Sequence, residues 1–419
     1  MRILHVLHNS VPLLCGYSIR SSYIVNLERA MGWDPGVVTS GQHPNGDATR
    51  ETIAGTEYRR TAAPKNLPLP FAREWALMKS LERQVEAAAR DARPDVIHAH
   101  SPVLVGLPAL RVARRLDIPM VYEIRDLWEN ASVDRGRFAA DSPLYRIARG
   151  LESYVVRHAG AVVTICDLLK REIAPRAGNA DKVHVIPNAV DTDAFRPQAA
   201  NEALARRWGL IGKDVILYAG TFQPYEGLDL VIRAMADIVR ARPSAHLVIV
   251  GGSAGFAGQS GTTSPEERAL LAAVQDSAVS AHVTFTGRIP HADVKEMYAL
   301  ADVLCYPRRM TMTTALTTPL KPLEGMAMAK AVVASDVPAM REIVEDGVTG
   351  LLFKAGDIQD LALKCIALLS DAALRQRLGN GGRDWVVRER QWRSVVAKYG
   401  DVYSAVLHAP VHRAEKIPA

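Results

Sequence analysis

The sequence predicts an α/β protein made of two Rossmann-like halves, each with a parallel sheet covered by helices. Short β-branched runs alternate with amphipathic helical segments along the chain. The predicted strands are continuously apolar, which is typical of strands buried on both faces of a parallel sheet. The chain has 419 residues, and about 150 residues per domain gives two or three domains.

The first half is predicted to comprise residues 1–190. Its expected strands are 3–7, 37–39, 95–98, 120–122, 161–165 and 183–186. Apolar residues recur at helical spacing among charges in two long segments between these strands. These segments, 73–93 and 142–158, are therefore predicted to be amphipathic helices.

The alternation restarts after a Pro/Asn turn at 186–191. The second half, 191–390, has expected strands at 215–218, 246–250, 283–285, 302–306 and 331–334. A final helix at 391–407 carries an aromatic stripe that we expect to be core, formed by Trp392, Val396, Tyr399 and Tyr403. Ligands of parallel sheets bind outside the carboxyl ends of the strands, so a cleft between two facing sheets is the predicted site.

Composition and charge exclude several classes of protein. With 48% hydrophobic and 23% charged residues, the chain is neither collagen-like, coiled-coil nor disordered. The net charge of +6 suits anionic substrates or lipid, but no long basic run predicts a nucleic-acid partner. Four widely spaced cysteines favour reduced thiols in a cytoplasmic protein. We expect no signal peptide and no membrane span.

The strongest local signal for a ligand lies in 318–329. Pro322 indicates a helix start, which puts Lys321 and Glu324 on one face of the first turn beside free N–H groups. Lys321 and the amides could hold phosphate, while Glu324 accepts from ribose hydroxyls. The alternative is a first-turn glutamate that interacts with the helix dipole and has Lys321 as its salt-bridge partner.

This segment carries a family resemblance. Pro-Leu-Glu-Gly-Met-Ala-Met-Ala-Lys at 322–330, Val-Val-Ala-Ser-Asp at 332–336 and Arg-Glu-Ile-Val at 341–344 resemble the signature of family 4 retaining glycosyltransferases, whose fold is GT-B. The resemblance covers about residues 1–405 and is closest to subfamilies that assemble bacterial exopolysaccharide or surface glycans. Tyr-Glu-Ile-Arg-Asp-Leu-Trp-Glu at 122–129 also resembles the exosortase-associated branch.

The resemblance implies transfer of a sugar from a nucleotide-diphosphate sugar to a glycan or lipid-linked acceptor, without a metal or other cofactor. The acceptor is expected on the first domain, to which the final helix crosses back, and the donor on the second. The implied donor-binding residues are Gly16, Gly220, Thr221, Gly252, Lys321, Glu324 and Asn188. The implied catalytic residues are Arg308, Lys321, His100 and Arg125, and the implied sugar-pocket residues are Arg20, His98 and Asp126.

Each of these roles has a structural alternative. Gly16 follows the first strand and leaves room for a phosphate, or it is a plain strand-to-helix turn. His98 and His100 lie on one face of a strand, where one lines the sugar pocket or both are core histidines, and no third metal ligand is expected. Arg20, Arg125 and Asp126 face the cleft or are surface charges. Asn188 closes the interdomain loop, as the resemblance implies, or caps a turn.

Three departures from the family pattern affect this interpretation. The first of two glutamates is absent, because Leu316 stands eight positions before Glu324. A usual Arg and Lys pair matches Thr221 and Glu226, and a usual histidine matches Arg125. The leaving diphosphate would then be met by Arg308, Arg309 and Lys321. The alternatives are a nucleotide-sugar epimerase or hydrolase, and a catalytically silent scaffold of polysaccharide assembly.

A helix with basic residues raises the question of membrane contact. Arg111, Arg114 and Arg115 accompany Leu107 and Leu110 on this helix, which could lie on anionic lipid at the inner face of the membrane. The alternative is a solvated helix face on a cytoplasmic protein.

Overall fold

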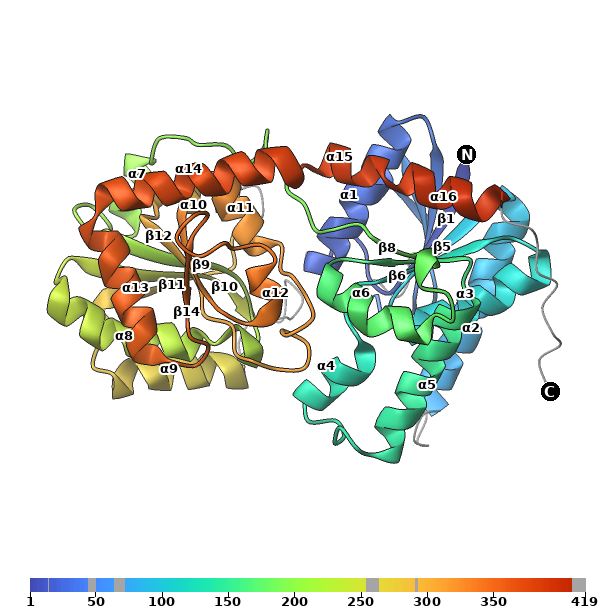
Figure 1. Ribbon diagram of the computed structural model, residues 1–419, viewed down its shortest axis with the longest axis horizontal. Helices are drawn as coiled ribbons and strands as arrows, with labels where there is room; N and C mark the ends of the chain where they lie inside the picture. Colours follow the sequence, from blue (N-terminus) through green and yellow to red (C-terminus); the bar gives the residue numbers. More distant parts are fainter. Residues whose placement is uncertain (14, 44–49, 64–71, 254–263, 291–292, 409–419) are drawn as a thin grey trace.

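The computed structural model describes the chain except residues 14, 44–49, 64–71, 254–263, 291–292 and 409–419. Two units lie side by side, and each is a sheet with helices on both faces (Figure 1). The first unit is built on strands β1–β8 and the second on β9–β14. This arrangement confirms the predicted α/β fold with two parallel-sheet halves.

The first sheet has eight strands in the order β3-β4-β2-β1-β5-β6-β7-β8. They are β1 (Arg2–Leu7), β2 (Asp34–Thr39), β3 (Arg50–Ile53), β4 (Thr56–Arg60), β5 (Val96–His100), β6 (Met120–Ile124), β7 (Ala161–Thr164) and β8 (Val183–Val185). All neighbours are parallel except β3 and β4. This hairpin was not among the predicted strands, because its edge strand is polar and partly exposed and so lacks the continuous apolar run of a buried strand.

Helices cover both faces of this sheet. They are α1 (Gly16–Ala30), α2 (Ala72–Ala92), α3 (Val103–Leu116), α4 (Trp128–Asp134), α5 (Pro143–His158) and α6 (Asp167–Ile173). The start of α5 is set by its cap, since the Ser142 side chain accepts from the Tyr145 N–H and Pro143 occupies the first turn. The predicted helices at 73–93 and 142–158 are therefore confirmed.

The second sheet has six parallel strands in the order β11-β10-β9-β12-β13-β14. They are β9 (Asp214–Phe222), β10 (Ala245–Ser253), β11 (Val283–Gly287), β12 (Val303–Tyr306), β13 (Ala331–Ser335) and β14 (Leu351–Phe353). The missed strand, β14, has only three residues. The helices are α7 (Glu202–Arg207), α8 (Leu228–Ala241), α9 (Pro265–Asp276), α10 (Val294–Leu300), α11 (Lys321–Ala327), α12 (Pro338–Arg341), α13 (Ile358–Ser370) and α14 (Ala372–Glu389).

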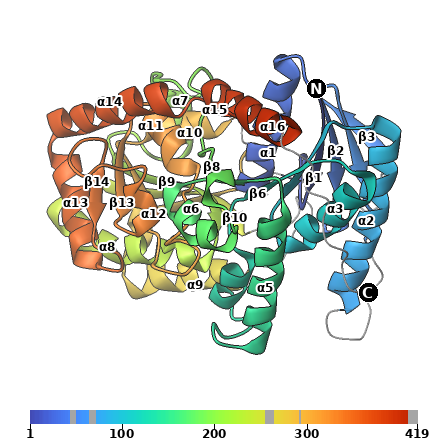
Figure 2. The same ribbon diagram turned by 45° about the vertical axis from the view of Figure 1, so that its right-hand side comes forward.

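The end of the chain returns to the first unit. Helix α14 runs along the second unit, and α15 (Trp392–Ala397) and α16 (Tyr399–His408) lie over the first (Figures 1 and 2). The predicted single helix is thus two, separated at Lys398. Its aromatic stripe is core, as expected: Trp392, Tyr399 and Tyr403 pack with the apolar cluster of the first sheet.

Direct contacts join the two units near the cleft. The Asp134 carboxylate accepts from the backbone N–H groups of Met312 and Thr313, at 3.1 and 2.8 Å. The Cys166 thiol donates to the carbonyl of Leu316 at 2.9 Å, and the Leu316 side chain packs against the apolar cluster of the first unit. The segment that leads into α11 is therefore held by residues of both units.

A buried carboxylate organises the interior of the first unit. Glu123 on β6 has no exposed surface, and it accepts hydrogen bonds from Arg20 Nε at 3.0 Å and Arg125 Nε at 2.7 Å. Burial raises the pKa of Glu123, but the positive charges of these arginines more than offset that effect and bring its pKa well below the usual range. Tyr399 of α16 also donates to Glu123, and Arg20 donates to the carbonyl of Ile186 at 2.8 Å. One ion cluster therefore joins β6, α1, α16 and the segment that leaves the first unit.

A directed chain of hydrogen bonds continues from this cluster. Arg125 Nη2 lies 2.6 Å from His100 Nδ1, and because arginine only donates, Nδ1 must accept. Burial lowers the pKa of His100 well below its ordinary value, so the neutral ring carries its proton on Nε2. That N–H donates to His5 Nδ1 at 3.0 Å, and His5 Nε2 then donates to Glu28 at 2.6 Å.

His5, His98 and His100 form a group whose ring nitrogens lie within 4.8 Å of one another. The sequence analysis did not find His5 as the third member, because it lies on a distant strand, β1. The hydrogen bonds nevertheless do not fit a metal. If a metal took His100 Nε2 while Nδ1 accepted from Arg125, the ring would have to be an imidazolate anion.

We expect Arg20→Ala to lower the free energy of unfolding by about 3 to 5 kcal/mol, the usual cost of breaking a buried ion pair. Urea denaturation would measure this loss. Arg240→Ala is the control, because that guanidinium is 76% exposed and pairs with Asp237 on the surface. A variant of normal stability that fails to bind ligand would contradict the structural role and favour the predicted sugar-pocket role of Arg20.

Candidate active site

The topology of both sheets points to the same cleft. In the first sheet β1 lies between β2 and β5, and in the second β9 lies between β10 and β12. Ligands of open parallel sheets bind outside the strand ends where the chain reverses direction across the sheet. A cavity of about 780 Å³ lies there, lined by residues that follow β1 and by the ends of β9, β10 and β12. This volume suits a small-molecule ligand.

Two glycines form the floor of the cavity. Gly220 on β9 and Gly251 on β10 are direct neighbours in the parallel register. A Cβ on Gly251, whose φ is +130°, would lie 1.9 Å from the carbonyl oxygen of Gly220. A Cβ on Gly220 would lie 2.3 Å from Cε of Lys321. Gly220 therefore leaves room for the Lys321 side chain, and Gly251 leaves room for the backbone of Gly220.

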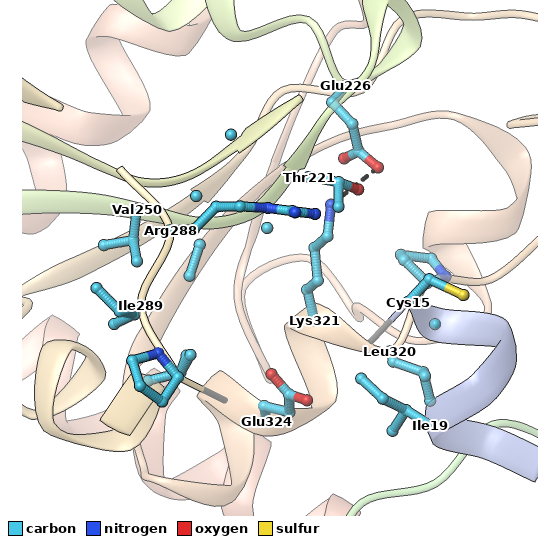
Figure 3. Close-up of a pocket in the computed structure, with 18 of the residues that line it drawn as sticks. Cys15, Ile19, Thr221, Glu226, Val250, Arg288, Ile289, Leu320, Lys321 and Glu324 are labelled. Atoms are coloured by element: carbon cyan, nitrogen blue, oxygen red, sulfur yellow. Dashed lines mark ion pairs between the residues drawn. The ribbon is translucent and has the colours of Figure 1, made fainter. Parts of the chain in front are cut away.

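Lys321 is paired with a buried acid of the second unit. Its Nζ lies 3.0 Å from Glu226 Oε1 and donates to the Tyr218 hydroxyl at 2.6 Å (Figure 3). Burial raises the pKa of Glu226, but Lys321 and Arg308 outweigh this and lower it overall, so the carboxylate stays ionised. The pairing differs from the Lys321–Glu324 salt bridge considered as an alternative, because the side chain extends over Gly220 toward Glu226.

Other cations also reach the cavity. Arg308 is 5% exposed, with Nε 3.9 Å from Glu226 Oε2 and Nη1 donating to the Thr317 carbonyl at 2.9 Å. Arg288, which the sequence analysis missed, lines the wall and points toward Thr221 and Lys321 in Figure 3. It follows strand β11 as a lone arginine, so no motif marked it.

Arg309 was the third cation expected to meet a diphosphate. It pairs instead with Asp229 of α8, and it does not line the cavity. Among the described residues, the lysine and arginine side chains that line the cavity are therefore Lys321, Arg308 and Arg288.

Glu324 projects into the opposite side of the cavity (Figure 3). Pro322 stands in the first turn of α11, as predicted, and this start places Lys321 and Glu324 three residues apart. Glu324 Oε2 accepts from the Tyr298 hydroxyl at 3.0 Å, which fixes the carboxylate. Thr221 and Gly252, two further predicted donor-binding residues, also line the cavity.

The first unit supplies the facing wall, mainly from α1 and the turn before it. Gly16 is the first residue of α1, and a Cβ there would meet only Leu320 Cδ1, at 3.8 Å. Packing within the protein therefore does not require glycine at position 16. Because glycine has no side chain, the space beside it remains part of the cavity, which fits the predicted phosphate contact.

Several predicted site residues do not line the cavity. Arg20, His98, His100 and Arg125 belong to the buried cluster around Glu123, where ion pairing and hydrogen bonding hold them inside the first unit. The expectation that one histidine lines the sugar pocket is thus wrong for this structure.

Asp126 and Asn188 also lie outside the cavity lining. Asp126 is half-buried, and burial raises its pKa. Asn188 Nδ2 donates to the Thr318 carbonyl at 2.7 Å, and its Oδ1 accepts from Arg20 at 3.3 Å. Asn188 therefore links the interdomain segment to the loop before α11, the contact that the resemblance implied.

The basic residues of α3 are occupied by neighbours. Arg115 pairs with Glu82 and Glu86, Arg111 lies 3.6 Å from Glu82, and Arg114 donates to a tyrosine hydroxyl of α5. Two of the three arginines expected to attract anionic lipid therefore pair with carboxylates of α2. Among the described residues, no helix is long and apolar enough to cross a bilayer.

Comparisons with known proteins place this architecture in a family. Residues 202–385 match the family model described as glycosyl transferases group 1, and residues 16–189 match the glycosyl transferase 4-like domain. The D-inositol 3-phosphate glycosyltransferase of Acidothermus cellulolyticus is 31% identical over 332 residues, 77% of this chain and 70% of that protein. The GDP-mannose-dependent alpha-(1-6)-phosphatidylinositol monomannoside mannosyltransferase of Mycobacterium tuberculosis is 28% identical, over 75% of this chain and 84% of that protein.

Solved structures agree with the fold. The sucrose-phosphate synthase of Thermosynechococcus elongatus has a TM-score of 0.77 at 20% identity, over 96% of this chain and 98% of that one. HepE of Anabaena, in complex with UDP-glucose, has a TM-score of 0.74 at 17% identity, over 97% and 100%. This chain belongs to family 4 of the GT-B glycosyltransferases, because 77% of it aligns with a glycosyltransferase at 31% identity and its two sheets face one cavity.

Proposed function

We propose that this glycosyltransferase moves a sugar from a nucleotide-diphosphate sugar to a glycan or lipid-linked acceptor, with retention at the anomeric carbon. The product belongs to a bacterial polysaccharide or glycoconjugate. The second unit holds the donor and the first unit receives the acceptor. The observation that carries the proposal is the cluster of Lys321, Arg308 and Arg288 around glycine-floored strand ends, opposite the carboxylate of Glu324.

The chemistry follows from where charge develops. When the glycosidic bond to the nucleotide breaks, negative charge grows on the leaving diphosphate, and fixed cations there stabilise the transition state. Lys321 and Arg308 are buried enough for this interaction to be strong, and Glu226 fixes the position of Lys321. Glu324 accepts from the ribose hydroxyls, and the diphosphate takes the proton of the attacking acceptor hydroxyl. No metal or cofactor is required in this scheme.

A catalytically silent scaffold is the second candidate, favoured by Leu316 at the place of the first family glutamate and by Glu226 at the place of a cation. It would bind partners of an assembly system without turnover. A nucleotide-sugar epimerase or hydrolase would consume the donor without an acceptor. A thermal-shift panel with nucleotides and nucleotide sugars separates the enzyme candidates, which bind a nucleotide, from the scaffold.

In that panel we expect one of UDP, GDP or ADP, and its sugar conjugate, to raise the melting temperature by a few degrees. A ligand at 100 times its dissociation constant adds about 2.7 kcal/mol to the free energy of unfolding. UDP-glucose and GDP-mannose are the first conjugates to include, because proteins similar to this chain carry those donors in their names or structures. The absence of a shift with every nucleotide would favour the scaffold.

Glu324→Ala should weaken binding of that nucleotide by about 1.5 to 3 kcal/mol, the range for a hydrogen bond to a charged group. Isothermal titration with the nucleoside diphosphate measures the change. Glu345→Ala, on the loop after α12, provides a carboxylate control outside the cavity. Equal nucleotide affinity in Glu324→Ala and wild type would remove the ribose role.

Lys321→Ala should reduce kcat by a larger factor than it raises KM for the donor, because the interaction strengthens only as the diphosphate leaves. Steady-state kinetics with the nucleotide sugar found in the panel would measure both constants. Lys354→Ala, an exposed lysine outside the cavity, is the matched control. A change confined to KM would mean that Lys321 binds ground state and transition state equally.

A further inference from the structure

The cavity wall supplied by the first unit offers little for a sugar to bind. Its lining residues are Pro12, Leu13, Cys15, Gly16, Ile19 and His43. Among these described residues, His43 alone has a side chain that forms strong hydrogen bonds in both directions. Arg20 and His98, which were expected in the sugar pocket, are held in the buried Glu123 cluster instead. So are His100 and Arg125, which were expected to be catalytic.

His43 is buried and yet unsatisfied. Its side chain lines the cavity and is 4% exposed, and neither ring nitrogen has a hydrogen-bond partner among the described residues. Buried polar atoms almost always have a partner, and an orphaned one costs free energy. The backbone N–H of His43 donates to the Ser40 carbonyl at 3.1 Å, a hydrogen bond that helps to position this residue in the turn after β2.

Neighbouring polar groups do not meet this need. The guanidinium group of Arg60 donates hydrogen bonds to Glu51, to Thr39 and to the Val11 carbonyl. The Ser40 hydroxyl donates to the His8 carbonyl at 2.8 Å. Since the described residues leave both ring nitrogens without a partner, we look for one in the cavity that the ring lines.

We propose that His43 is a sugar-binding residue that forms hydrogen bonds with a hydroxyl group of a sugar in the cavity. This inference rests on the proposed function. A hydroxyl group both donates and accepts, and an imidazole with one N–H and one lone pair is its complement. The hydroxyl group belongs either to the sugar that is transferred or to a sugar of the acceptor.

The charge of the ring agrees with this assignment. Burial, together with the positive charge of Arg60, lowers the pKa of His43 to about 4, and Glu51 partly opposes the shift. His8, whose own pKa is also lowered to about 4, lies near the ring as well. The imidazole is therefore uncharged at neutral pH, which suits a neutral hydroxyl better than a phosphate.

Three full-length variants test the inference: His43→Ala, His43→Gln and His246→Ala. Glutamine keeps a donor and an acceptor, so it should restore part of any lost binding. His246 is a matched control, because it is a buried histidine with an unpartnered Nδ1 that does not line the cavity. Melting temperatures identify any variant that fails to fold, and His43→Gln then carries the test.

Binding is measured by titration with UDP and UDP-glucose, and with GDP and GDP-mannose. If His43 binds the transferred sugar, His43→Ala lowers the affinity for the nucleotide sugar about 5- to 30-fold. The affinity for the nucleoside diphosphate then stays unchanged. If it holds the acceptor, both affinities stay the same. Saturation transfer from the nucleotide-bound protein to methyl α-D-glucopyranoside or methyl α-D-mannopyranoside is then lost in His43→Ala.

Unchanged affinities, together with saturation transfer that is unchanged in His43→Ala or undetectable in the wild type, would overturn the inference. Nucleotide binding by the wild type would still uphold the proposed function. Loss of binding in His246→Ala equal to that in His43→Ala would also overturn it, since the effect would be one of stability. If the wild type binds no nucleotide, the proposed function fails and this inference fails with it.

Discussion

A carboxylate with no access to water, Glu123, determines how the first unit is built. An ionised carboxylate can be buried only if cations and hydrogen bonds replace its hydration, and here Arg20, Arg125 and the Tyr399 hydroxyl do so. Those partners come from α1, the end of β6 and α16. The same interaction therefore explains why the end of the chain must return to the first unit. It also explains why Arg125, which follows β6, and the histidines of β5 are absent from the cavity.

The second unit uses its charges differently, because its ion pair lies at the edge of the cavity. Lys321 passes over Gly220 to reach Glu226, and Arg308 stands on the other side of that carboxylate. Glu226 stands at the position where the family pattern implies a cation, and it fixes in place the cation of Lys321, which comes from α11. The ion pair with Glu226 fixes the position of Lys321, but the carboxylate also offsets the positive charge of that lysine. Arg308 and Arg288 are therefore needed for a site that binds a diphosphate.

The sequence predicted both sheets well, because long apolar strands report their own burial. It missed β3, β4 and β14, since polar edge strands and a strand of three residues lack that signal. For the site, Gly220, Lys321 and Glu324 were identifiable from a local motif. His43 and Arg288 were not, because they are single residues that only the folded chain brings to the cavity. The pairing of His100 with His5 depends on strand order, which no local pattern states.

Leu316 connects the missing glutamate with the contact between the units. Its partly buried side chain packs against the apolar cluster of the first unit, a contact that leucine makes at lower desolvation cost than a carboxylate would. The segment around it is held by Asp134 at Met312 and Thr313, and by Asn188 at Thr318. Within that segment the Thr317 carbonyl accepts from Arg308, so a cation of the donor site is positioned by a loop that the first unit holds. Leu316 therefore adds an apolar contact between the two units at the position where the family pattern has a glutamate.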